Sequence, residues 1–425
     1  MPHWLTVAFL FALAAHLAVQ IWLSRRQENH VAAHRNAVPT AFADTVTLAE
    51  HQKAADYTVA RQRFGRLEIL VDAGVLVLLT LVGGIALLGE FAAGLGLPRV
   101  WTGTVHVLAT FLAVSAVSLP FSAWRTFVLE ERFGFNRTTP KVFIADLAKS
   151  LVLGGLLGGA IVAVVLWVMS ASGPHWWLIA WGVWTAFSLT LLWAWPRWIA
   201  GIFNKFVPLE DQALRARIDA LLARCDFHAK AVYVMDGSKR SAHGNAYFTG
   251  LGREKRIVFF DTLLQSLTPV QVEAVLAHEL AHFKLKHIPQ RLVVGSVATF
   301  AGFALLGWLA RQEWFYSALG VGVPSDSSAL LLFLLALPAF TWVITPLGAA
   351  WSRRHEFQAD AFAARFSNGP ELARALVGMY RENASTLTPD PLHSAFYDSH
   401  PPPVARIARP VGHSPAVGQP AVSAS

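Results

Sequence analysis

The sequence predicts a mainly α-helical, polytopic membrane protein that carries a small α+β lobe. The first reason is composition, because 54% of the 425 residues are hydrophobic and only 15% are charged. With a mean hydropathy of +0.44, the chain is too apolar for a soluble protein of this length. Sixteen tryptophans also fit a membrane protein, in which such rings gather at the interfaces. The single cysteine, Cys225, excludes an internal disulfide and a cysteine-rich zinc cluster.

Seven apolar runs are the second reason, because each is long enough, at about 20 residues, to cross a bilayer as a helix. The first run lacks the cationic segment and the small-residue cleavage site of a signal peptide, so we expect a membrane anchor. The expected spans are Trp4–Leu23, Ile69–Phe91, Trp101–Phe121, Leu151–Ser170, Trp176–Trp195, Leu292–Ala310 and Ala329–Ala350.

The cations alternate between the connections, and this pattern predicts the orientation. The connections after the first, third and fifth spans and the C-terminal segment are basic, whereas those after the second and sixth hold only Arg99 and Arg311. By the positive-inside rule, the N-terminus faces outward, and the long fifth connection and the C-terminus face the cytoplasm. The net charge of +8 follows this topology, so we expect no nucleic-acid partner. Abundant arginine and alanine indicate a bacterial chain, hence an inner-membrane location.

Residues 200–290 lie in the long fifth connection and are predicted to form a small soluble lobe. Turn residues Gly250-Leu251-Gly252 separate two apolar runs and predict a hairpin. Residues 410–425, rich in Pro, Ala, Ser and Val, predict a disordered tail. The expected elements of the lobe are a helix near Leu209–Cys225 and strands near Val232–Met235, Asn245–Thr249 and Arg256–Phe260.

The helical stretch that begins at Thr268-Pro269 carries the strongest chemical signal, His278-Glu279-Leu280-Ala281-His282. Two histidines four residues apart lie on one face of a helix, so both imidazoles can reach a single metal ion. Glu279 then lies beside the metal, where it can take a proton from a bound water. The alternative is a polar helix with two exposed histidines. The apolar residues around the motif argue against that alternative, because they bury the helix and leave the histidines on one edge.

A catalytic zinc needs a third protein ligand and an open position for water. A metzincin is excluded because Leu285 and Ile288 stand where that class has glycine and histidine. His287 is more than a turn beyond His282 and rotated off the shared face. Glu356 and Asp360, again four residues apart, could supply one zinc ligand and one acceptor for the free N–H of a ligand histidine. The alternative is a solvated, charged helix end.

These motifs closely resemble those of the M48 metalloproteases, and in particular the Ste24-type CAAX prenyl proteases. The resemblance runs in order from about Gln52 to Arg406 on a seven-helix frame. One departure is Gly244, where the family has a serine, and it leaves the zinc motifs untouched. The other segments that carry the resemblance are Phe133–Pro140, Asn245–Gly250, Lys255–Val258, Pro389–Leu392 and Ser399–Pro402.

The resemblance assigns roles by position. His278, His282 and Glu356 match the zinc ligands of the family, one zinc per chain. Glu279 matches the general base, and Asp360 the carboxylate beside a ligand histidine. Asn245 and His400 match residues that contact the substrate backbone or the oxyanion.

The resemblance also implies helices that enclose an intramembrane chamber, with a gluzincin-type zinc protease lobe on its cytoplasmic side. The expected partners are membrane lipids and peptide or membrane-protein substrates with a lipid or strongly apolar segment. The regions are then residues 1–199 with five spans, 200–290 with the zinc helix, 291–350 with two spans, 351–409 with the third ligand, and the 410–425 tail.

Two alternatives remain at this point. An HtpX-like quality-control protease has the same chemistry but fewer spans. A transporter or a non-catalytic lipid-binding scaffold belongs to a different class. The intact Glu279 argues against a scaffold, which needs no general base, and most spans lack the acidic residues of a transporter.

Overall fold

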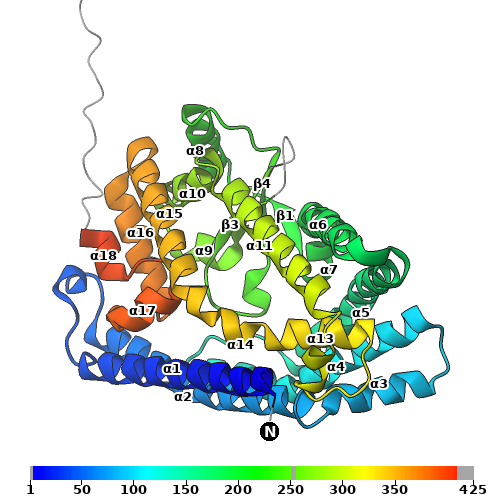
Figure 1. The fold of residues 1–425 in the computed structure, drawn as a ribbon. Coiled ribbons are helices and arrows are strands. Elements are labelled where there is room, and N and C mark those ends of the chain that lie inside the picture. The colour runs from blue at the N-terminus through cyan, green and yellow to red at the C-terminus, as the bar shows by residue number, and fades with distance from the viewer. Residues whose placement is uncertain (1–2, 250–254, 409–425) are drawn as a thin grey trace, which may run out of the picture.

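The computed structural model describes residues 3–249 and 255–408, and most of them are helical. Long apolar helices form one part of the molecule, and a mixed sheet with shorter helices forms the other (Figure 1). α1 (Trp4–Ala33) and α2 (Leu48–Leu79) pack side by side along the bottom of the view. The hairpin turn expected at Gly250–Gly252 and the tail at 410–425 lie outside the described residues.

The long apolar helices match the predicted membrane spans. Among the described residues, six helices are long and apolar enough to cross a membrane, or seven when the bent pair α2 and α3 counts as one span. The polytopic fold is therefore confirmed. Besides α1 and α2, the helices that make up these spans are α3 (Gly84–Gly94), α4 (Arg99–Trp124), α5 (Pro140–Ala171), α6 (Trp176–Ala194), α11 (His287–Leu309), α13 (Asp326–Ala336), α14 (Pro338–Thr341) and α15 (Thr345–Phe366).

Two spans differ in shape from the uninterrupted helices that the sequence predicts. The run Ile69–Phe91 contains a break between α2 and α3, with a bend of 57°. Gly83 adopts a left-handed φ of 91° there, which an L side chain rarely tolerates. The run Ala329–Ala350 passes through α13, α14 and the start of α15, with Pro338 at the first break.

The lobe is built on a four-stranded sheet with the order β1-β2-β4-β3. β2 and β4 are parallel, and the other two pairs are antiparallel. Because β3 stands at one end of the strand order, it is an edge strand. The three predicted strands and the predicted helix are confirmed, whereas β1 was not predicted. The bounds are β1 (Phe206–Pro208), β2 (Ala231–Met235), β3 (Ala246–Thr249), β4 (Arg256–Phe260) and α8 (Gln212–Arg224).

α10 (Pro269–Lys284) is the central helix of the lobe. Thr268 and Gln271 form a capping box at its start, and Pro269 occupies the first helical position. Leu276 and Leu280 are at most 1% exposed and belong to the core shared by α8, the sheet and α16. Truncating such a side chain to alanine costs about 2–5 kcal/mol. Because this face is buried, α10 is held with its other edge toward α15.

The remaining helices connect or cover these parts. The C-terminal ones lie beside α15 at the left of Figure 1, next to the turn that joins α1 and α2. Their bounds are α7 (Ala200–Phe203), α9 (Asp261–Ser266), α12 (Glu313–Ser317), α16 (Gly369–Glu382), α17 (Pro391–Tyr397) and α18 (Pro403–Ala408).

Candidate metal centre

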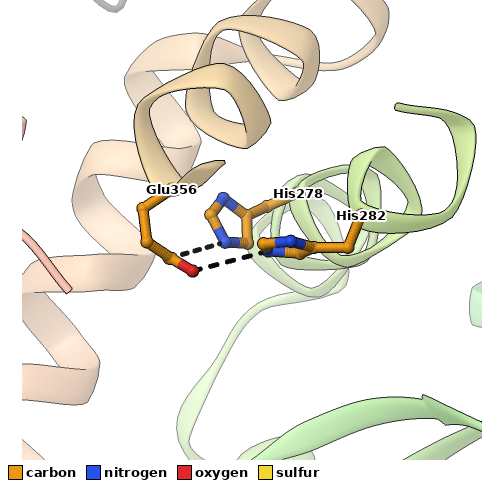
Figure 2. A group of neighbouring side chains, drawn as sticks. All are labelled: His278, His282 and Glu356. Atoms are coloured by element: carbon orange, nitrogen blue, oxygen red, sulfur yellow. Dashed lines mark ion pairs between the residues drawn. The ribbon is translucent and has the colours of Figure 1, made fainter. Parts of the chain in front are cut away.

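Two side chains on the edge of α10 that faces α15 and one side chain of α15 converge on one point (Figure 2). Nε2 of His278 lies 3.3 Å from Oε2 of Glu356, and Nε2 of His282 lies 3.6 Å from Oε1 of the same carboxylate. One donor atom from each residue lies within 4.8 Å of the other two. The i, i+4 spacing on α10 therefore places both imidazoles as the sequence predicts, and α15 contributes Glu356 from a distant part of the chain.

The three side chains fit a divalent metal. Glu356 is 4% exposed, and its Oε2 has no hydrogen-bond partner among the described residues. A buried carboxylate oxygen without a donor is costly unless a cation or a proton satisfies it. Two imidazoles and one carboxylate are a donor set that zinc accepts, with a fourth position left for water or substrate.

Asp360 lies one helical turn beyond Glu356, and its carboxylate faces the ring nitrogen of His278 that points away from Glu356. Its Oδ1 is 2.8 Å from Nδ1 of His278, so the second nitrogen of that ring is free to face the metal position. Arg406 of α18 holds the carboxylate from behind, donating to both oxygens. The sequence left open which acid does which task, and the geometry favours Glu356 toward the metal and Asp360 behind the histidine. Arg406 was missed, because nothing in its local sequence points to this contact.

The two histidines titrate differently in the metal-free protein. Burial alone lowers the pKa of His278, but the carboxylates of Asp360 and Glu356 outweigh that effect and raise its pKa to about 9. Burial and the nearby His278 lower the pKa of His282 to about 4. At neutral pH one of the two imidazoles is thus charged and the other neutral.

Glu279 faces a cavity of about 710 Å³ between the lobe and the N-terminal helices α1 and α2. His278, Asn245 and His400 line the same cavity. Burial raises the pKa of Glu279 above that of an ordinary glutamate. A carboxylate with a raised pKa beside a metal position is suited to exchange protons with a substrate near neutral pH.

Asn245 and His400 both line this cavity. Asn245 immediately precedes the edge strand β3, and its side-chain oxygen accepts a bond of 2.8 Å from its neighbour's backbone N–H. The imidazole of His400 follows α17 and is 64% exposed, with Nε2 3.5 Å from Oε2 of Glu356. Both residues therefore line the same cavity as His278 and Glu279.

His243 anchors the segment before Asn245, and sequence reasoning gave it no role. Its ring stacks on Phe135 at 4.5 Å, and its Nδ1 lies 3.1 Å from the amide oxygen of Asn383. Nε2 of His243 is 3.7 Å from Glu130, which also accepts a bond of 2.7 Å from Tyr57. These contacts join α2 and the Phe133–Pro140 segment to the start of β3, so they fix the strand that leads into the cavity.

The sequence argues against His287 as a ligand, and this residue does not belong to the group of three donors. It nevertheless contacts the site, because its Nδ1 lies 3.0 Å from Nδ1 of His282. The sequence offered no sign of this contact, since the two histidines are five positions apart and the helix ends between them.

Comparisons with known proteins agree with this architecture. Residues 27–205 match the family model described as CAAX prenyl protease N-terminal, five membrane helices, and residues 208–410 match that of peptidase family M48. A CAAX prenyl protease 1 homolog of Oryza sativa is 33% identical over 92% of this chain and 93% of its own length. CAAX prenyl protease 1 of Saccharomyces cerevisiae is 36% identical over 68% of each chain. The crystal structure of S. mikatae Ste24p superposes with a TM-score of 0.89 at 29% identity, over 96% of this chain and 99% of that one.

Proposed function

Because the chain belongs to peptidase family M48, of the CAAX prenyl protease type, we propose that it is a zinc endopeptidase whose metal is held by His278, His282 and Glu356. The protein is a Ste24-like membrane metalloprotease. The observation that carries the finer proposal is the convergence of three donor atoms within 4.8 Å, next to a large cavity that His278 and Glu279 line.

When bound, zinc would lower the pKa of a water toward about 7 and polarise the scissile carbonyl. Glu279 takes the proton of the attacking water and later delivers it to the leaving amine. His400 donates to the oxygen that becomes negative during attack. Asp360 accepts the Nδ1–H of His278 and keeps that ring turned toward the metal.

The edge strand β3 supports an extended substrate, because its outer side has no strand partner among the described residues. A peptide lying there can pair with the backbone, and the Asn245 amide can bind a peptide group next to the cut. The cavity is walled on its other side by helices that belong to the membrane region. We therefore expect substrates whose scissile bond lies near a lipid or strongly apolar segment. In a bacterium, membrane or misfolded proteins are better candidates than prenylated ones.

The cation pattern supports a multi-pass protein with its C-terminus and its catalytic lobe in the cytoplasm of a bacterial cell. The division into residues 1–199, 200–290, 291–350, 351–409 and 410–425 remains part of the same proposal.

A purified preparation tests the chemistry. Glu279→Gln should retain zinc and the wild-type melting temperature while losing most turnover of a reporter peptide, since glutamine is nearly isosteric but cannot accept the proton. Glu382→Gln, on the solvent side of α16, is a matched control that should leave turnover unchanged. Wild-type turnover in the Glu279→Gln variant would rule out water activation by this residue.

A further inference from the structure

A row of polar side chains continues from His282 away from the metal position. Nδ1 of His282 lies 3.0 Å from Nδ1 of His287, and Nε2 of His287 lies 3.0 Å from Oε1 of Gln358 on α15. His287 is the first residue of α11, and Lys286 before it has a left-handed φ of 58°. This turn between α10 and α11 brings the ring of His287 back against the end of the metal helix.

The proton positions along this row follow from the metal position. His282 must keep the lone pair of Nε2 for the metal, so its proton is on Nδ1. Nδ1 of His287 is then the acceptor, and the proton of that ring is on Nε2. From there it is donated to the side-chain oxygen of Gln358, which can only accept. Every group in the row is neutral, and each contact has one donor and one acceptor.

Packing holds the middle ring of the row in place. His355 stacks on His287 with ring centroids 3.9 Å apart and planes 2° from parallel. Both rings are 2% exposed. Trp351 closes the other side of His355 with an edge-on contact of 4.9 Å. Because His355, Glu356 and Gln358 all come from α15, the helix that supplies a metal ligand also fixes the support of a second one.

The two ligand histidines thus differ in what stands behind them. His278 has the carboxylate of Asp360, whereas His282 has a neutral imidazole. A carboxylate partner gives its histidine more negative character and a neutral partner does not. We propose that His287 is a positioning residue that fixes the tautomer and ring plane of His282. The inference rests on the proposed zinc ligands.

The test separates the hydrogen bond from the packing. His287→Phe keeps a flat ring to stack on His355 but removes the acceptor. His287→Asn loses the ring, yet its side-chain oxygen can take the place of Nδ1. We measure the zinc dissociation constant of the full-length protein by competition with a chelator, with His282→Ala as the benchmark for a lost ligand. His228→Phe, an exposed histidine of the same lobe, is the control.

His287→Phe should weaken zinc binding about 10- to 100-fold, and His287→Asn should recover most of that loss. Wild-type zinc affinity in the Phe variant would overturn the proposal, and so would an Asn variant no better than the Phe variant. Zinc retained at wild-type affinity by His282→Ala would instead overturn the ligand assignment. Melting temperatures without zinc identify a variant that merely fails to fold.

A separate observation concerns the opposite wall of the cavity, which α2 provides through Thr58, Arg61 and Gln62. The guanidinium of Arg61 lies over the ring of Tyr57 at 5.4 Å. Within the described part of the chain it has no hydrogen bond and no carboxylate within 4.0 Å. By contrast, Arg125 in the same wall is paired with Glu68.

Glu130 attracts Arg61 at a distance, but no carboxylate of the described residues contacts its guanidinium. Glu130 accepts the Tyr57 hydroxyl and faces His243, as described above. Glu279 is required at the scissile bond. We infer that Arg61 binds a carboxylate of the peptide substrate, either a free C-terminus or an acidic side chain. A planar guanidinium supported by an aromatic ring suits this task. This inference also rests on the proposed function.

Binding to the Glu279→Gln protein tests the idea without turnover. The probes are fluorescent peptides that end in a free acid or an amide, each with an internal Glu or Gln. A carboxylate at the recognised position should tighten binding about tenfold, and Arg61→Gln should erase the difference. Arg63→Gln is the control, because Arg63 lies on the same helix but pairs with Glu28 and does not line the cavity. Equal binding of all four peptides, or a preference that survives Arg61→Gln, would overturn the inference. Peptides that bind but are not cleaved by the wild type would contradict the protease function instead.

Discussion

Arg406 holds Asp360 through both carboxylate oxygens, with Nε 2.8 Å from Oδ2. Arg406 is 5% exposed and comes from α18, whereas Asp360 lies on α15 behind His278. A buried carboxylate remains ionised only when it is paired in this way. α18 therefore supports the proposed metal centre indirectly, because Arg406 keeps the carboxylate of Asp360 aimed at Nδ1 of His278.

Arg406→Gln should lower zinc affinity by about 10- to 100-fold, the usual effect of losing a group that supports a metal ligand. The reason is that Asp360, once unpaired, no longer holds His278 in one orientation. Chelator competition measures the change. Arg374→Gln is the matched control, because Arg374 forms an exposed ion pair with Glu371 on α16. Equal zinc affinity in the Arg406 and Arg374 variants would contradict the indirect role.

The purified protein should bind about one zinc per chain, because one set of three ligands is found among the described residues. His278→Ala, His282→Ala and Glu356→Ala should each lower zinc content sharply. Metal analysis by mass spectrometry after dialysis checks this. Full zinc occupancy in Glu356→Ala would refute the assignment of the third ligand.

Zinc binding should release about one proton near pH 7. The pKa of His278 is raised to about 9, so this imidazole is protonated in the metal-free protein and must lose its proton to bind. The pKa of His282 is lowered to about 4, so that residue contributes none above about pH 5. Zinc affinity should accordingly rise with pH up to about 9. Titration calorimetry in buffers of different ionisation enthalpy counts the protons, and no release at pH 7 would contradict the charged His278.

The sequence predicts the parts of this site that depend on local spacing. His278 and His282 are four residues apart on one helix, so their common face follows from helical geometry alone. Arg406 and His287 could not be predicted, because a contact between distant helices leaves no periodic signal. His287 also depends on the left-handed turn at Lys286, which no composition rule anticipates.

In the fold, too, some features follow from a sequence signal and others do not. Hydropathy predicts the long spans, since every residue of a membrane helix contributes to the average. The bend after Leu79 was missed because apolar residues continue through it, although Gly83-Gly84 was a visible sign of a break. β1 is only three residues long and ends at Pro208, so neither length nor alternation revealed it.

His400→Ala and Asn245→Ala should affect catalysis in different ways. His400 acts on the oxygen that becomes charged in the transition state, so its loss should lower kcat about 100-fold with little change in KM. Asn245 holds substrate backbone in both the ground and transition states, so its loss should raise KM more than it lowers kcat. Steady-state kinetics on a reporter peptide checks both. A His400→Ala variant that changed only KM would assign that residue to binding.

The membrane topology can be tested independently of the catalytic mechanism. α11 begins at His287 beside the metal position and is 23 residues long, so it carries the chain about 35 Å away. The chain returns through α13, α14 and α15 to Glu356, again at the metal position. The loop before α13 must then lie across the membrane from the site.

A reporter inserted at Val323, which is 82% exposed, should report the outside. Reporters at Glu210 and after Ser425 should report the cytoplasm. A cytoplasmic signal from Val323 would remove the outward and return passes. α11 and the segment from α13 to α15 would then not cross the bilayer, and both the span assignment and the orientation would have to be abandoned.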